Sequence, residues 1–215
     1  ALLSEPSGLD VTVTLKKTGL ATEGLDYTLN GTITVLAGKP SGVATLVAKT
    51  DTLDEDEETV IIDIDTVTDG VEVDQQKQTV TILNGNASPT VSLSVASTSM
   101  NEDPAATTTQ TVVTATLSDV SAKEVRVILT QGGSATHLLD YTINSLIVIP
   151  AGVGSGSVTL IAVNDAVYEA DEVVELVIAS AVNATAVGVM QVVTIVSDDF
   201  KPKVSLLTER TVINE

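Results

Sequence analysis

Acidic side chains are concentrated in one turn between two apolar segments of this chain. A β-branched run ends at Asn164-Asp165, Glu169, Asp171 and Glu172 follow, and a second apolar run starts at once. The segment 44–61 repeats this design earlier in the chain. Clustered carboxylates repel one another, so the chemistry that these residues suggest is the binding of a neutralising cation.

Further acids lie near the ends of other apolar segments in the second half. If the strands alternate in direction, their loops converge at one end of a domain, and the converging oxygen donors are Glu102, Asp140, Asn164, Asp165, Glu169, Asp198 and Asp199. Calcium takes 6–8 oxygen ligands, a demand that these side chains and a carbonyl of the 165–168 turn meet. The alternative is that the acids are solvated loop residues of a very acidic protein.

Other chemistries have little support in the sequence. Zinc is a poor candidate because the chain has one histidine and no cysteine. His137 is read as a surface residue without a catalytic partner at a recognisable spacing. The paired acids lack aromatic platforms for a sugar, so a glycosidase is not expected. We therefore predict that the chain is not an enzyme.

Composition limits the fold and the partners. The chain has 215 residues, 43% of them hydrophobic but only 2% aromatic, so its core must be built from Val, Ile, Leu, Ala and Thr, which favours strands. The formal charge of −19 argues against nucleic acid as a partner. No apolar run reaches the length of a membrane span, so direct membrane insertion is not expected.

The two halves of the sequence repeat each other. Ala1 aligns with Ala115, an offset of 114, and Asp26-Tyr27 then aligns with Asp140-Tyr141. The offset becomes 113 near the end of the unit. There the motif Pro-x-Val-Ser-Leu, which begins at Pro89, occurs again beginning at Pro202. A period of this length indicates an array of whole domains.

The spacing of turn signals predicts seven short strands in the second unit, at 90–97, 109–118, 123–130, 145–149, 156–164, 172–180 and 190–197. We predict an all-β protein of tandem immunoglobulin-like antiparallel sandwiches. Residues 1–86 form a repeat that lacks its first strand and most of its second, and 87–200 form a complete repeat. Residues 201–215 form the first strand of a following repeat.

Several ordered motifs resemble the Calx-beta domain family. They are Gly133–Thr136, Asp140-Tyr141, Ile149–Gly152, Asn164–Glu172 and Thr194–Asp199. The resemblance implies a seven-strand sandwich whose calcium ligands are the second-unit residues named above. In the first unit it implies a weaker site from Asp26, Asp51 and Glu55, where Asn84-Gly85-Asn86 replaces the terminal aspartates.

The resemblance leads to three functional hypotheses. The leading one is a calcium-stiffened structural or adhesive segment of a secreted or cell-surface multi-repeat protein, such as a stalk, filament or matrix component. The second is a regulatory calcium-sensor pair of a membrane transporter, and the third is a purely structural repeat without metal. The expected location is extracellular, and the expected partners are neighbouring repeats, copies of the same chain, or an unidentified surface or matrix ligand.

The end of the chain suggests one more hypothesis. Residues 203–215 repeat the strand that the first unit lacks, so one hypothesis is that they add as a strand to the first unit of another copy, head to tail. The alternative is that the sequence is a slice of a tandem array.

Overall fold

The computed structural model describes residues 1–103, 105–106 and 108–207, and these residues divide into two compact units, Ala1–Ala87 and the unit that begins at Ser88. The prediction had placed this boundary between residues 86 and 87. The part of the strand-addition hypothesis that concerns 208–215 lies outside the described residues. Within the described ranges every regular element is a strand, and no helix is long and apolar enough to cross a membrane.

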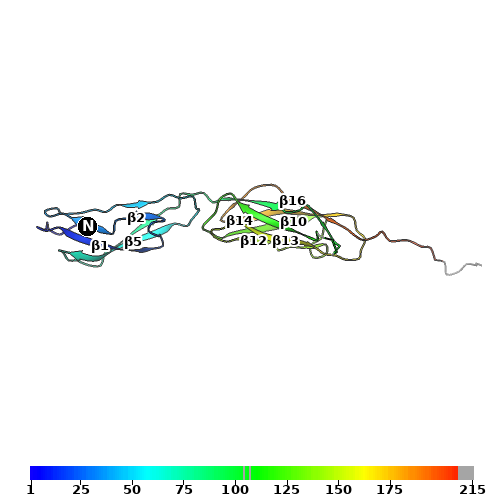
Figure 1. The fold of residues 1–215 in the computed structure, drawn as a ribbon, viewed down its shortest axis with the longest axis horizontal. Coiled ribbons are helices and arrows are strands. Elements are labelled where there is room, and N and C mark those ends of the chain that lie inside the picture. The colour runs from blue at the N-terminus through cyan, green and yellow to red at the C-terminus, as the bar shows by residue number, and fades with distance from the viewer. Residues whose placement is uncertain (104, 107, 208–215) are drawn as a thin grey trace, which may run out of the picture. The chain divides into compact units, whose positions relative to one another are not determined.

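Unit 2 is a sandwich of two five-stranded sheets (Figure 1). The first sheet has the order β12-β10-β14-β16-β8, where the strands are β12 Leu146–Ile149, β10 Val125–Gly133, β14 Glu172–Val182, β16 Gln191–Val196 and β8 Ser99–Asn101. The second has the order β11-β13-β9-β7-β15, with β11 Tyr141–Thr142, β13 Ser155–Ala162, β9 Gln110–Leu117, β7 Thr90–Val95 and β15 Thr185–Ala186. All seven expected strands correspond to one of these. The fold class is therefore that of an immunoglobulin-like sandwich.

Two pairings in unit 2 depart from the expected antiparallel plan. The short strands β8 and β15 pair in parallel with β16 and β7, respectively. Sequence reasoning did not predict these strands, because runs of two or three residues carry too few apolar positions to show a period.

The core of unit 2 lies between the two sheets and is aliphatic. Val113, Val127, Ile147, Leu160 and Leu176 are among its fully buried side chains. Alternation along each strand produces this burial; for example, β9 reads buried, exposed, buried from Thr111 onward. Among the described residues of unit 2, Tyr141 is the aromatic residue in the core, and it is 2% exposed.

Unit 1 contains the counterparts of six unit 2 strands. One sheet has the order β3-β1-β5-β6, formed by β3 Thr32–Val35, β1 Val11–Gly19, β5 Glu58–Thr68 and β6 Lys77–Ile82. A second sheet pairs β2 Tyr27–Leu29 with β4 Leu46–Ala48. Ala1 and Leu3 bond to Gly42 and Pro40, as β9 bonds to β13 in unit 2. Tyr27, Leu29 and Val60 form one buried cluster beneath these sheets, and Val11, Val13 and Val35 are buried as well.

The two units share local details that the repeated sequence implies. A register shift follows Thr14 in β1 and Ile128 in β10, which are equivalent positions. Each of these strands ends in a glycine at positive φ, 122° at Gly19 and 103° at Gly133. A Cβ atom at either glycine would lie 2.1 Å from a carbonyl oxygen of the adjacent strand. Glycine at these positions therefore allows the end of β1 or β10 to approach the backbone of the adjacent strand closely.

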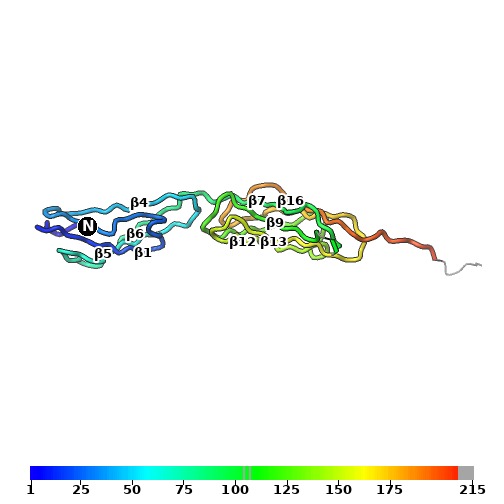
Figure 2. Tube along the Cα trace, in the orientation of Figure 1, coloured from blue at the N-terminus to red at the C-terminus, as the bar shows by residue number. Residues whose placement is uncertain are grey.

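Residues 201–207 continue from unit 2 as an exposed segment outside the sheets, and Figure 2 shows their orange to red trace leaving the strands.

Candidate metal centre

Strand pairing brings the acidic residues of unit 2 to one end of the sandwich. Because β8 runs parallel to β16, the ends of the two strands meet, and the Glu102 amide donates to the Val196 carbonyl at 3.2 Å. Glu102 therefore lies beside Asp198 and Asp199, which follow β16. The carboxylate oxygens of these three residues lie within 4.8 Å of one another.

The other strands place a second group of acids at the same end. The start of β11 pairs with the end of β13, and the Val163 amide donates to the Asp140 carbonyl at 2.9 Å. Glu172, the first residue of β14, pairs with Ile195 near the end of β16. Asp140, Glu169 and Glu172 have carboxylate oxygens within 4.8 Å of one another. Electrostatic repulsion couples the two groups. Besides burial, the charges of Glu169 and Asp140 raise the pKa of Glu102.

Hydrogen bonds within the loops fix two of these carboxylates. Asp140 accepts a bond from the Thr136 amide at 2.5 Å, and Asp165 accepts one from the Val167 amide at 2.7 Å. Both bonds close short turns, in which an aspartate side chain replaces a backbone acceptor. Each bond leaves carboxylate lone pairs free to face the cluster.

Glu102 is the most informative residue of the cluster. It is 6% exposed, and among the described residues nothing donates a hydrogen bond to its carboxylate or forms an ion pair with it. Burial, and then the charges of Glu169, Asp165, Asp198 and Asp140, raise its pKa from 4.5 to about 7. A buried carboxylate without partners costs free energy unless a proton or a cation neutralises it.

Other acids of the cluster show the same lack of compensation. Burial and the neighbouring Asp140 raise the pKa of Glu172, and burial followed by Asp140, Asp165 and Asp199 raises the pKa of Glu169. One oxygen each of Glu172 and Asp199 is buried without a hydrogen-bond partner among the described residues. The lysine that the structure places at this turn, Lys201, lies over the ring of Tyr168 at 5.7 Å.

The expected ligands are distributed unevenly around this centre. The two groups contain five of the seven residues that the sequence suggested, and Asp165 adjoins them through its effect on Glu102 and Glu169. Asn164 is exposed and belongs to neither group. Glu172 was not in the expected ligand set. Its signal was present in the sequence, because it follows the acidic turn directly and lies on the same face of its strand as the buried Val174 and Leu176.

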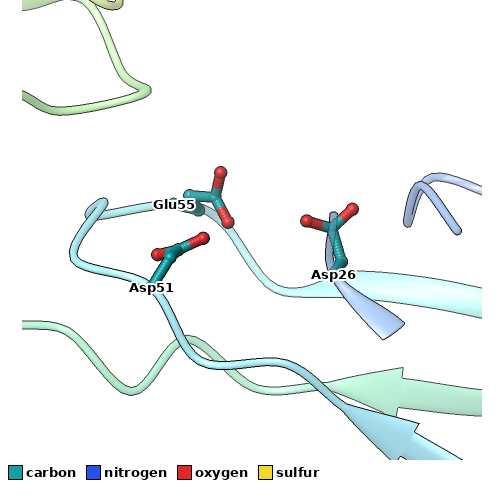
Figure 3. Close-up of side chains that lie close together, drawn as sticks. All are labelled: Asp26, Asp51 and Glu55. Atoms are coloured by element: carbon teal, nitrogen blue, oxygen red, sulfur yellow. The ribbon is translucent and has the colours of Figure 1, made fainter. Parts of the chain in front are cut away.

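Unit 1 has a related group made of Asp26, Asp51 and Glu55 (Figure 3). Asp26 precedes β2, whereas the other two belong to the turn after β4, and the carboxylates point toward one another. Their oxygens lie within 4.8 Å of one another and line a pocket of about 230 Å³. Burial and the charges of Asp51 and Asp26 raise the pKa of Glu55.

The oxygen donors of unit 2 fit a hard divalent cation. They are carboxylates from four separate segments of the chain, and calcium accepts such irregular sets of oxygen ligands. Zinc would require nitrogen or sulfur ligands. His137, which contacts the Tyr141 ring at 5.4 Å, is in neither group.

Comparison with known proteins gives limited further information. No family model and no curated protein matches the sequence. Among solved structures, CBD12 from CALX1.2 aligns over 82% of this chain and 70% of its own, at 15% identity and a TM-score of 0.34. The calcium binding domain CBD12 of CALX1.1 aligns over 79% of this chain and 68% of its own, at 15% identity and a TM-score of 0.30.

A third similar structure is the CsuC-CsuE chaperone-tip adhesion subunit pre-assembly complex of Csu pili from Acinetobacter baumannii. It aligns over 90% of this chain and 88% of its own, at 11% identity and a TM-score of 0.25. The fold assignment therefore depends on the strand pairing described above.

Proposed function

We propose that unit 2 is a Calx-beta-type sandwich that binds calcium at the end of the domain where Glu102, Asp140, Glu169, Glu172, Asp198 and Asp199 converge. The observation that carries this proposal is Glu102, a buried carboxylate surrounded by other acids and without a donor among the described residues. A divalent cation supplies the missing positive charge. The two carboxylate groups suggest two adjacent ion positions.

Calcium in this position would act on stability. Repulsion among the acids opposes the closure of four loops, and a ligand that binds only the closed form stabilises the folded state by mass action. Asp198 and Asp199 follow the last strand, so bound calcium would also order the segment that leaves the unit. We infer a mechanical role on this basis: a repeat of a secreted or cell-surface stalk, filament or matrix protein, rather than an enzyme.

The extracellular location is part of the same proposal. Extracellular modules use calcium sites with dissociation constants of roughly 10⁻⁴–10⁻³ M, weaker than those of cytosolic sensors. Asn164 in place of a carboxylate, and its exposed position, are consistent with a site of modest affinity.

Thermal melts of the 215-residue chain in calcium and in chelator test calcium binding directly. We expect calcium to raise the melting temperature of unit 2 in the wild type, and the Asp165→Ala variant to show a much smaller rise. Asp171→Asn is a matched control, because it removes a charge from the same turn at an exposed position outside both groups. Equal melts of the wild type in calcium and in chelator would refute the proposal.

Residues 203–207 support a second proposal, which concerns partners. Val204 and Leu206 are 93% and 99% exposed, whereas their sequence equivalents in β7, Val91 and Leu93, are 0% and 8% exposed. We propose that this segment adds as a strand to another repeat, including one in a second copy of the chain. In unit 2 the strand β9 lies between β7 and β13, so a complete acceptor requires a strand at the β9 position as well.

Light scattering tests this second proposal. The variant Leu206→Asp should lower the molar mass or the self-association constant of the chain, because a charged residue does not enter the core position that Leu93 occupies in β7. Unchanged self-association on deletion of 203–215 would refute strand addition between chains.

A further inference from the structure

The two units differ in the residue that follows the last strand and lies beside the acidic turn. Asn86 of unit 1 is the sequence equivalent of Asp199 of unit 2. The Asn86 side-chain amide donates to the Leu53 carbonyl at 2.6 Å and to the Asp51 carboxylate at 3.3 Å. Asn86 therefore links the segment after β6 directly to the acidic turn after β4.

Asn84 holds Asn86 in place. The Asn84 side-chain oxygen accepts a bond from the Asn86 amide nitrogen at 3.0 Å, and its side-chain nitrogen donates to the Asp54 carboxylate at 2.9 Å. The same nitrogen donates to the Asn86 carbonyl at 3.2 Å. The two asparagines thus form a connected set of donors and acceptors between two loops that are 30 or more residues apart in the sequence.

Unit 1 also contributes a positive charge at its pocket. Lys49 lines the pocket with Asp26, Asp51 and Glu55, and its ammonium group donates to the Gly24 carbonyl. The equivalent residue in unit 2 is Val163, which has no charge.

In the described part of unit 2, Ser197 and Asp199 stand at the positions of Asn84 and Asn86, so the two side-chain amides have no counterpart there. Asp199 carries only acceptors when ionised, and one of its oxygens is buried without a hydrogen-bond partner among the described residues. The residue equivalent to Leu53 is Val167, whose carbonyl is a further acceptor. A carboxylate, a turn carbonyl and a second carboxylate are all acceptors, so an added donor, proton or cation is needed to join them.

We propose that Asn86, positioned by Asn84, is a built-in substitute for a cation, and that the residue at this position determines whether the acidic turn of a unit requires calcium. In unit 1 the asparagine amide closes the turn without metal and competes with any ion for Asp51. In unit 2 the aspartate adds no donor, so the bond from the Val167 amide to Asp165 closes the turn without support from the last strand, and an ion is needed to hold it closed. The unit 2 half of this inference depends on the proposed calcium site.

The two units would therefore differ in how their acidic turns respond to calcium. The acidic turn of unit 1 keeps its structure at any calcium concentration, and the turn of unit 2 orders only above its dissociation constant. One repeat of such a chain remains rigid while its neighbour responds to calcium.

Two equivalent amides report on the two turns. The Leu53 amide donates to Asp51 at 2.8 Å, and the Val167 amide donates to Asp165 at 2.7 Å. Hydrogen exchange at these amides, followed by NMR on the full 22.1 kDa chain, measures the opening of each turn separately. Calcium chloride and a chelator are the two conditions.

In the wild type we expect Leu53 to exchange equally slowly in both conditions, and Val167 to exchange about tenfold or more faster in chelator. The variant Asn86→Ala removes two hydrogen bonds, so Leu53 should exchange about tenfold faster in chelator, and calcium should restore little of its protection. The variant Asn86→Asp should show the same acceleration in chelator, and calcium should reverse it.

The reciprocal variant uses the other unit. By its equivalence to Asn86, Asp199→Asn should supply an amide donor to the Val167 carbonyl and Asp165, so Val167 should exchange slowly in chelator and lose its response to calcium. Asp199→Ala is its control and should leave Val167 fast in both conditions.

Three results would overturn the proposal. The first is calcium protection of Leu53 as large as that of Val167 in the wild type. The second is unchanged exchange of Leu53 in Asn86→Ala, and the third is fast exchange of Val167 in Asp199→Asn. If Val167 does not respond to calcium in the wild type, the proposed calcium site fails, while the chelator measurements on Asn86→Ala still decide the role of Asn86.

Discussion

Replacing Glu102 with glutamine should have opposite effects on stability with and without calcium. Glutamine has nearly the same volume as glutamate but carries no charge, so Glu102→Gln changes the electrostatics of the buried position without creating a cavity. In chelator it removes the charge that the structure leaves uncompensated. In calcium it removes a negatively charged ligand.

The magnitude in chelator follows from the pKa of Glu102. Its rise from 4.5 to about 7 means that ionising this carboxyl at pH 8 costs the folded state about 3 kcal/mol, at about 1.4 kcal/mol for each pKa unit. We expect about 1–2 kcal/mol to remain in the measured difference, because water and the surrounding loops relax around the charge. At roughly 4–8 °C for each kcal/mol, unit 2 of Glu102→Gln should melt on the order of 5–10 °C higher than the wild type at pH 8.

The assay is differential scanning calorimetry of the full chain at pH 8 and pH 5.5, in chelator and in calcium. At pH 5.5 the wild-type carboxyl is mostly protonated when folded but mostly ionised when unfolded, so the stabilising effect of the substitution should be less than half of that at pH 8. In calcium at pH 8 the variant should gain less stability than the wild type does. Asp171→Asn serves as the control for a general change in net charge.

Two outcomes would refute this reasoning. A lower melting temperature for Glu102→Gln in chelator at pH 8 would show that the ionised carboxylate is compensated in the folded protein. A calcium-induced rise equal to that of the wild type would show that Glu102 is not a ligand.

The remaining predictions concern pH, backbone and core. In chelator the free energy of unfolding, measured by urea titration, should fall as pH rises from about 4.5 through 7, because folded Glu102 and Glu172 keep protons that the unfolded chain releases. In saturating calcium the same measurement should show the opposite slope. Gly133→Ala should destabilise unit 2 by at least about 2 kcal/mol, since its Cβ would lie 2.1 Å from the Val173 carbonyl oxygen. Gly152→Ala should cost less, because Gly152 also has a positive φ, of 77°, but open space around it; urea denaturation measures both losses. Tyr141→Ala should cost about 3–5 kcal/mol and Tyr141→Phe about 1 kcal/mol or less, because the hydroxyl makes only a 3.4 Å bond to Gln131, and equal losses in urea denaturation would contradict this assignment.

The sequence was sufficient to predict the strands that have a clear period. Burial alternates along all of β9 and along the first six residues of β10, and the predicted segments 109–118 and 123–130 overlap these strands. The fold class follows from such strands, because alternating faces without helical segments must pack as two sheets. The short strands β8 and β15 were missed, since their pairing depends on longer neighbours.

The candidate site was predictable in its residue types but not in its arrangement. The acidic turn and the terminal aspartates are visible as sequence motifs, and their equivalence between units follows from the repeat. Glu172 was missed because it was read as the start of a strand, and Asn164 was included because it stands beside Asp165 in the turn. The structure places Glu172 opposite Ile195 of β16 and leaves Asn164 exposed, and neither placement can be read from the residues beside them in the sequence.

What the sequence alone determined is the repeat, the β-rich composition and the location of the acidic turns, because each of these depends on neighbours along the chain. Only the tertiary structure decided that Glu102 is buried among Asp198, Asp140 and Glu169, since a parallel pairing of β8 with β16 joins segments that are far apart in sequence. Only the tertiary structure showed that Asn86 bonds to the acidic turn of unit 1. Burial and hydrogen bonding depend on what surrounds a side chain in space, and these two properties distinguish a turn that needs a cation from one that does not.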